Sequence, residues 1–190
     1  MPIAERDALA AIRADSEDPS AHHALGYVYL FTRRFDDSLA EFEVALRLNP
    51  NFSLAQAYYG LTLSYCGRSG RCEEADRAVR GALRLSPRDP FSAIYMGIAA
   101  YVQFVGRNYD EAMQLGREAI RQRGDFVGTH RVLTAAAGAA GHTEIAAAAL
   151  QELSRAQPNI SLPWIADEMP IMQGGELEHY LEAFRRARSD

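Results

Sequence analysis

A spacing of small, apolar and proline residues returns about every 34 residues, and it constrains the fold more than any other feature of the sequence. Counting from Pro19 as position 1, Leu25 and Gly26 occupy positions 7 and 8, Ala45 position 27 and Pro50 position 32. The same register, with alanine at position 20, returns in the segments 53–89, 90–126 and 127–160. A unit this short buries its apolar face only by stacking on its neighbours, so the sequence predicts a stack of similar modules.

Each segment contains two amphipathic stretches in which apolar residues recur at i, i+3, i+4 and i+7, as in a helix with one buried face. No stretch alternates apolar and polar residues with period two, so we expect no β-sheet. The pattern resembles the tetratricopeptide repeat, a helix hairpin of this period, over residues 19–160. The resemblance implies a single all-α domain, residues 1–190: a right-handed α-solenoid of about four repeats with ten or eleven helices.

The flanking segments complete the stack. We expect residues 1–18 to form a half-repeat with one helix, placed like the second helix of an earlier unit. In the C-terminal segment 161–190, Trp164 lies where a fifth repeat would begin, but Pro170 interrupts that helix. The stretch 176–187 then has one apolar and one charged face, which is typical of a terminal cap.

The second and third repeats each contain three residues more than the period. We place the extra residues of the second repeat in CGRSGRC, between its two helices, and those of the third near VGRNY, again between helices. Cys66 and Cys72 flank the first insertion. Their hairpin placement permits a disulfide, but two free thiols are the expected state of so few cysteines.

In tetratricopeptide repeats, positions 2, 5, 6, 9, 12 and 13 face the concave side of the solenoid. The resemblance therefore predicts a protein-binding groove with these residues: His23, Tyr27, Phe31, Tyr58, Leu61, Tyr65, Phe91, Tyr95, Ile98, Tyr101 and Arg131. An aromatic stripe of this kind suits an apolar peptide or helix. The alternative stays open that part of the stripe packs against neighbouring helices or is covered by the C-terminal helix.

The family's carboxylate clamp, which holds acidic chaperone tails, is absent. It requires lysine, asparagine and arginine where this chain has His23, Tyr27 and other aromatic or apolar residues. The formal net charge of −5 also argues against sequence-independent binding of nucleic acid. No apolar run reaches the ~18 residues of a membrane span, and the N-terminal residues do not resemble a signal peptide. We expect a cytoplasmic protein that binds neither nucleic acid nor membrane.

No chemical site emerges from the sequence. It has no motif for a catalytic nucleophile, a phosphate-binding loop or a dinucleotide, and its five histidines lack zinc-ligand spacing. We predict no catalytic residue, no cofactor and no metal, and a scaffold that binds a protein or peptide ligand. All 20 basic residues are arginines, and alanine and arginine codons are GC-rich, which suggests a bacterial source.

A finer resemblance concerns the stretches 25–68, 86–90, 162–170 and 180–187. They look like the repeat regions C-terminal to bacterial class III adenylate or guanylate cyclase domains, and similar regions follow DNA-binding domains in some bacterial regulators. The cyclase domain itself is not in this chain. This resemblance implies an alternative function: a regulatory or self-association domain of such a protein, with a possible homodimer.

Overall fold

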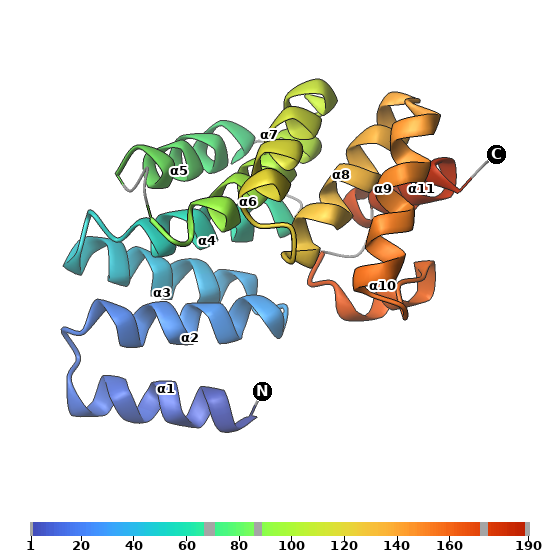
Figure 1. The fold of residues 1–190 in the computed structure, drawn as a ribbon. Coiled ribbons are helices and arrows are strands. Elements are labelled where there is room, and N and C mark those ends of the chain that lie inside the picture. The colour runs from blue at the N-terminus through green and yellow to red at the C-terminus, as the bar shows by residue number, and fades with distance from the viewer. Residues whose placement is uncertain (1, 67–70, 86–88, 172–174, 189–190) are drawn as a thin grey trace.

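The computed structural model describes residues 2–66, 71–85, 89–171 and 175–188, and these residues contain eleven α-helices and no β-strand (Figure 1). The all-α solenoid predicted from the repeat is confirmed. None of these helices is both long and apolar enough to cross a bilayer. The helices are α1 (Pro2–Ala14), α2 (Pro19–Phe31), α3 (Phe35–Leu48), α4 (Ser53–Tyr65), α5 (Cys72–Leu85), α6 (Ser92–Val105), α7 (Tyr109–Gln122), α8 (Val127–Ala140), α9 (Thr143–Ala156), α10 (Leu162–Glu168) and α11 (Gly175–Ala187).

Four helix hairpins, α2–α3, α4–α5, α6–α7 and α8–α9, follow one another and pack in sequence, with α1 on the free side of α2. Glycines allow the two helices of a hairpin to approach closely. A Cβ atom on Gly26 would meet the Phe42 ring at 3.0 Å, and one on Gly60 would lie 2.9 Å from the Ala75 carbonyl oxygen. Glycine inside a helix costs about 1 kcal/mol relative to alanine, and close packing offsets that cost.

The turns within three hairpins share a residue with left-handed backbone conformation. Arg33 (φ 61°), Arg107 (φ 66°) and Gly141 (φ 78°) occupy equivalent places after α2, α6 and α8. This region favours glycine, because other side chains crowd the backbone there. Two of the three turns nevertheless use arginine, and both arginine side chains reach the C-terminal segment, as described below.

The structure places the extra residues of the third repeat differently from the sequence prediction. The turn between α6 and α7 has three residues, 106–108, as does the turn 32–34 in the first hairpin, so the predicted insertion near VGRNY is wrong. The extra residues instead precede α6. The register of α6 therefore shifts by three residues and puts Ala100, which is fully buried, where Gly60 lies on α4.

The insertion of the second repeat does separate α4 from α5, although residues 67–70 lie outside the described part of the chain. Cys66 and Cys72 are thiols rather than a disulfide, and the Sγ atom of Cys66 donates a hydrogen bond of 3.2 Å to the Leu63 carbonyl oxygen.

The C-terminal segment folds back onto the solenoid instead of continuing it. Helix α10 has only seven residues, and α11 then packs along α8 (Figure 1). The buried face of α11 contains Leu177, Tyr180, Ala183, Phe184 and Ala187. Helix α8 presents small residues to it: a Cβ atom on Gly138 would overlap the carbonyl oxygen of Ala183. The run of alanine and glycine in α8 thus forms the surface on which α11 packs.

Gly138→Ala tests this close packing of α11 on α8. We expect the added methyl group to force α11 away from α8 and to lower the free energy of unfolding by about 1–3 kcal/mol. The matched control is Gly116→Ala in α7, where a Cβ atom would make an ordinary contact with Leu133 at 3.5 Å. That control should gain up to ~1 kcal/mol from helix propensity. Urea denaturation measures both, and equal stabilisation by the two variants would contradict the described packing of α11.

Candidate functional site

A pocket of about 400 Å³ lies on the concave side, where the first helices of the four hairpins meet the C-terminal segment. This is the concave pocket. It is lined by Tyr27, Phe31, Tyr58, Leu61, Tyr65, Ile94, Gly97, Ile98, Tyr101, Phe126, Gly128, Arg131, Val132, Trp164, Glu168, Met169, Pro170 and Tyr180. A second hollow, of about 560 Å³, lies over α7, α8 and α9 and contains none of the predicted groove residues.

The structure brings eight of the eleven predicted groove residues together around the concave pocket. They are Tyr27, Phe31, Tyr58, Leu61, Tyr65, Ile98, Tyr101 and Arg131. Three predicted residues lie elsewhere. His23 packs among the rings of Phe42, Phe52 and Tyr58, with ring centroids 5.2 to 5.8 Å apart.

Phe91 and Tyr95 miss the pocket because of the register shift in the third repeat. Phe91 precedes α6 and is 45% exposed, whereas Tyr95 is buried and its hydroxyl donates a hydrogen bond of 3.0 Å to Asp89. A shift of three residues replaces them with Ile94 and Ile98, which do line the pocket. The sequence prediction is wrong for these two residues because it put the three extra residues of the third repeat after α6 rather than before it.

The C-terminal segment covers part of the aromatic stripe, which is the alternative that the sequence left open. Trp164 and Tyr180 line the pocket from α10 and α11. The signal for Trp164 was its place at the start of a fifth repeat, although its position there is not one of those predicted to face the groove. The amphipathic pattern puts Tyr180 on the apolar face of its helix, but its place in the pocket depends on how α11 folds back over α6 and α8.

The outer part of the pocket consists of Tyr27, Phe31 and Tyr58. The rings of Tyr27 and Phe31 have centroids 4.6 Å apart, and Tyr27 meets Tyr58 edge-on at 5.1 Å. Tyr27 and Phe31 remain 38% and 40% exposed. Tyr58 is less exposed, and burial raises the pKa of its hydroxyl. These three rings form the mouth of the pocket.

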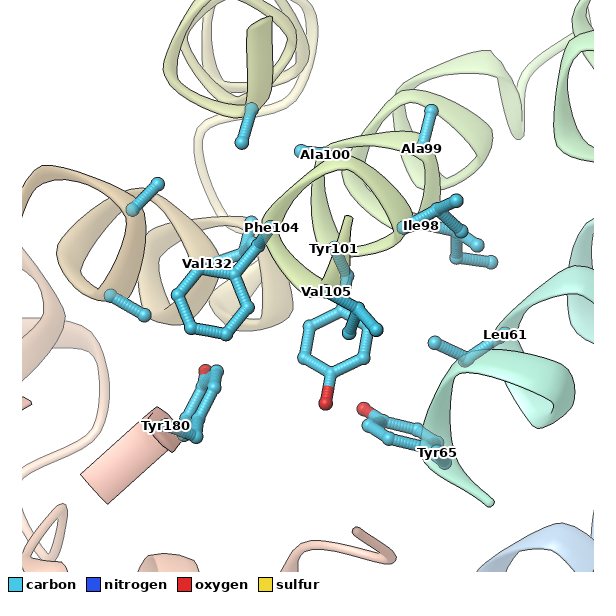
Figure 2. Packing of buried hydrophobic residues seen from close by; sticks show 14 of the residues in the cluster. Leu61, Tyr65, Ile98, Ala99, Ala100, Tyr101, Phe104, Val105, Val132 and Tyr180 are labelled. Carbon is cyan, nitrogen blue, oxygen red and sulfur yellow. The ribbon is translucent and has the colours of Figure 1, made fainter. Parts of the chain in front are cut away.

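The inner part of the pocket consists of Tyr65, Tyr101 and Tyr180, from α4, α6 and α11. Figure 2 shows the hydroxyl groups of Tyr65 and Tyr101 turned toward each other, with the ring of Tyr180 beside them. The ring of Tyr101 lies 4.8 Å from that of Tyr65 and 5.9 Å from that of Tyr180, centroid to centroid. All three side chains are buried, and burial raises the pKa of the Tyr65 hydroxyl to about 12.

Arg131, on α8, is the positively charged residue in the lining of the pocket. Its guanidinium lies 5.3 Å from the centre of the Trp164 ring, and its Nη1 atom donates a long hydrogen bond of 3.4 Å to Gln157. Its Nε atom is enclosed and has no hydrogen-bond partner among the described residues. Its charge opposes the rise that burial causes in the pKa values of Tyr65 and Tyr180.

Two turn arginines hold the C-terminal segment over the pocket. The Nη2 atom of Arg33 donates hydrogen bonds to the carbonyl oxygens of Ala166, Asp167 and Met169 at 3.1, 2.8 and 2.9 Å. A cation at the C-terminal end of α10 also complements the helix dipole. Arg107, at the equivalent turn, forms an ion pair of 3.2 Å with Glu176 on α11.

No group of three or more histidine, cysteine or acidic side chains is arranged to hold a metal ion in the described part of the chain. His179 of α11 lies between Phe104 and Tyr109 and contacts the Tyr109 hydroxyl at 3.2 Å. Burial, with the charges of Arg107 and Arg186, lowers the pKa of His179 to about 4. Burial alone lowers the pKa of His23 to about 4.

Comparison with known proteins gives a consistent picture. Two models of the tetratricopeptide repeat match the chain, over residues 19–52 and 67–125. The chain is 36% identical over 75 residues to a peroxisomal targeting signal receptor of Candida glabrata, which covers 40% of this chain but only 12% of the receptor.

Solved structures similar to this chain include PilW, a type IV pilus biogenesis factor, with a TM-score of 0.71, 17% identity and coverage of 95% of this chain and 78% of PilW. PilF of Pseudomonas aeruginosa has a TM-score of 0.66, 14% identity and coverage of 83% and 69%. YrrB, described as a repeat protein with an unusual peptide-binding site, has a TM-score of 0.57, 14% identity and coverage of 94% and 91%. At these identities the likeness shows the fold.

Arg33→Gln tests whether the hydrogen bonds of Arg33 keep α10 in place. We expect amide hydrogen exchange in residues 162–169 to become about two- to fivefold faster, because an exposed charged contact contributes up to about 1 kcal/mol. Mass spectrometry of the intact fold under native conditions measures the exchange. Arg117→Gln, which removes an exposed arginine from α7, is the control. Unchanged exchange in α10 would show that Arg33 does not hold this segment.

His23 and His179, two partly buried histidines with lowered pKa values, predict a pH dependence of stability. In the unfolded chain a histidine has a pKa near 6.5, above the folded value of about 4. Between these values the unfolded state binds more protons, so the free energy of unfolding falls as the pH is lowered from 7 to 5. Thermal melts should show a lower Tm at pH 5, and the double substitution His23→Phe with His179→Phe should reduce the difference. The control is His142→Gln at an exposed histidine; an equal reduction there would contradict the assignment.

Proposed function

The chain is a tetratricopeptide repeat protein, and we propose that it acts as a non-catalytic scaffold that holds a partner protein by a short apolar segment at the concave pocket. Repeat solenoids bind through their concave surfaces, because stacked hairpins present equivalent side chains side by side.

The observation that carries the proposal is the aromatic mouth formed by Tyr27, Phe31 and Tyr58. Two of these rings keep more than a third of their surface in water although they stand beside a pocket. Exposed aromatic rings at the edge of a concave site are typical anchors of protein interfaces, where they supply most of the binding energy. A partner side chain entering the pocket would bury them.

The size of the pocket supports a short segment rather than a long helix. Helix α11 already packs along α8, and the end of α10, which lines the pocket, is bonded to Arg33. An α-helix with its side chains is about 10–12 Å wide and would have to displace these elements. A few residues in extended conformation, with one or two large apolar side chains, fit the remaining space without such a change.

Two of the similar proteins bear descriptions that support a peptide ligand. One is called a targeting signal receptor, and the other is described as having a peptide-binding site. This chain spans about an eighth of the receptor's length, so the receptor's own ligand is not carried over. The class of ligand that these two descriptions name, a peptide segment, is what supports the present proposal.

A matched pair of exposed phenylalanines tests the proposal. Peptides selected from a random library against the full chain should carry an apolar anchor, and fluorescence anisotropy should give their affinities. Phe31→Ala should weaken binding about tenfold or more, because it truncates an aromatic anchor. Phe91→Ala removes a ring of similar exposure away from the pocket and should change affinity less than about twofold. Equal losses in both variants would contradict the concave site.

Light scattering separates the scaffold from the self-association alternative. A monomer over a wide range of concentration fits a free concave site. A dimer that persists on dilution, and that Phe31→Ala dissociates, would instead make a second copy of the chain the partner at this surface.

A further inference from the structure

The concave pocket is lined by one arginine, Arg131, whose hydrogen-bonding capacity the described residues do not use up. Arg131 forms no ion pair with any described carboxylate, and its enclosed Nε atom makes no hydrogen bond. Its two recorded contacts, the Trp164 ring and a long bond to Gln157, leave most of the guanidinium donors available. Arg131 is partly buried, and a bound anion would accept hydrogen bonds from the donors that the described residues leave unsatisfied.

Tyrosine hydroxyl groups share the pocket with Arg131, whose charge acts on the hydroxyls of Tyr65 and Tyr180. Tyr65, Tyr101 and Tyr180 line the same pocket, and all three side chains are buried. Figure 2 shows the hydroxyl of Tyr65 directed toward that of Tyr101. Tyrosine hydroxyls donate hydrogen bonds, and a guanidinium presents a planar fork of donors that matches a carboxylate.

The charge and size of the pocket restrict the ligand further. Glu168 lines the pocket from the end of α10, so a group with two negative charges would meet repulsion that a single carboxylate largely avoids. A volume of about 400 Å³ is at the small end of the range for small-molecule sites. Leu61, Ile98 and Val132 offer the apolar body of the ligand a surface in the same pocket.

We propose that the inner part of the concave pocket binds a compact apolar monocarboxylic acid, such as an arylalkanoic or medium-chain fatty acid, with its carboxylate on Arg131. The tyrosine hydroxyls donate hydrogen bonds to the same carboxylate, and the apolar body lies against the aliphatic wall. This goes beyond the proposed scaffold function, because the ligand is a small molecule that the partner protein does not supply.

Titration calorimetry on the full chain tests this site with 4-phenylbutyrate and its neutral counterpart 4-phenylbutyramide. We expect the carboxylate to bind at least about tenfold more tightly than the amide, as charge-assisted hydrogen bonds predict. Arg131→Gln should reduce the affinity for the carboxylate to that for the amide. Arg117→Gln, which removes an arginine outside the pocket, should leave both affinities unchanged. Tyr65→Phe should weaken the binding of the carboxylate, but not that of the amide, by about threefold or more.

Several results would overturn the proposal: no binding of the carboxylate, equal binding of carboxylate and amide, or undiminished binding by Arg131→Gln. Tighter binding of phenyl phosphate than of 4-phenylbutyrate would replace the monocarboxylate with a dianion and overturn the assigned ligand class. If circular dichroism shows that Arg131→Gln does not fold, Arg131→Lys keeps the charge and removes the planar fork, and it must still lower the preference for the carboxylate. Because peptide binding is measured separately through Phe31, failure here does not count against the scaffold.

Discussion

The close approach of α11 to α8 determines the shape of the concave side. Gly138 has no side chain, and the space that a Cβ atom would fill is taken by the backbone of Ala183. This contact directs Tyr180 onto Tyr101 and Phe104, with ring centroids 5.9 and 5.4 Å apart. A groove that repeat geometry alone would leave open along its whole length is thereby reduced to one pocket.

The same fold-back explains the two arginines with left-handed backbone conformation. Glycine would occupy such turns at lower cost, as it does after α8. Arginine at these positions directs a long cationic side chain toward the C-terminal segment: Arg33 reaches the carbonyl oxygens at the end of α10, and Arg107 reaches Glu176 at the start of α11. The backbone strain of these turns is thus accompanied by contacts that hold the C-terminal segment against the solenoid.

Much of this architecture could be predicted from the sequence, because helix periodicity and the small residues of each repeat are local signals. The hairpins follow from these signals, the early end of the tenth helix from Pro170, and eight of the pocket residues from the resemblance to the tetratricopeptide repeat. Phe91 and Tyr95 were misplaced because one insertion of three residues fits the pattern on either side of α6. Tyr180 and the role of Arg33 could not be predicted, since both depend on contacts between segments more than 75 residues apart, such as Arg33 with Asp167.

The central claim is that α11 lies on the concave face and supplies the inner side of the pocket. Nuclear Overhauser effects between selectively labelled aromatic rings measure this most directly in solution. The account predicts cross-peaks from the ring protons of Tyr180 to those of both Tyr101 and Phe104, at the separations given above. Cross-peaks of Tyr180 only to residues of α11 itself, with none to α6, would contradict it.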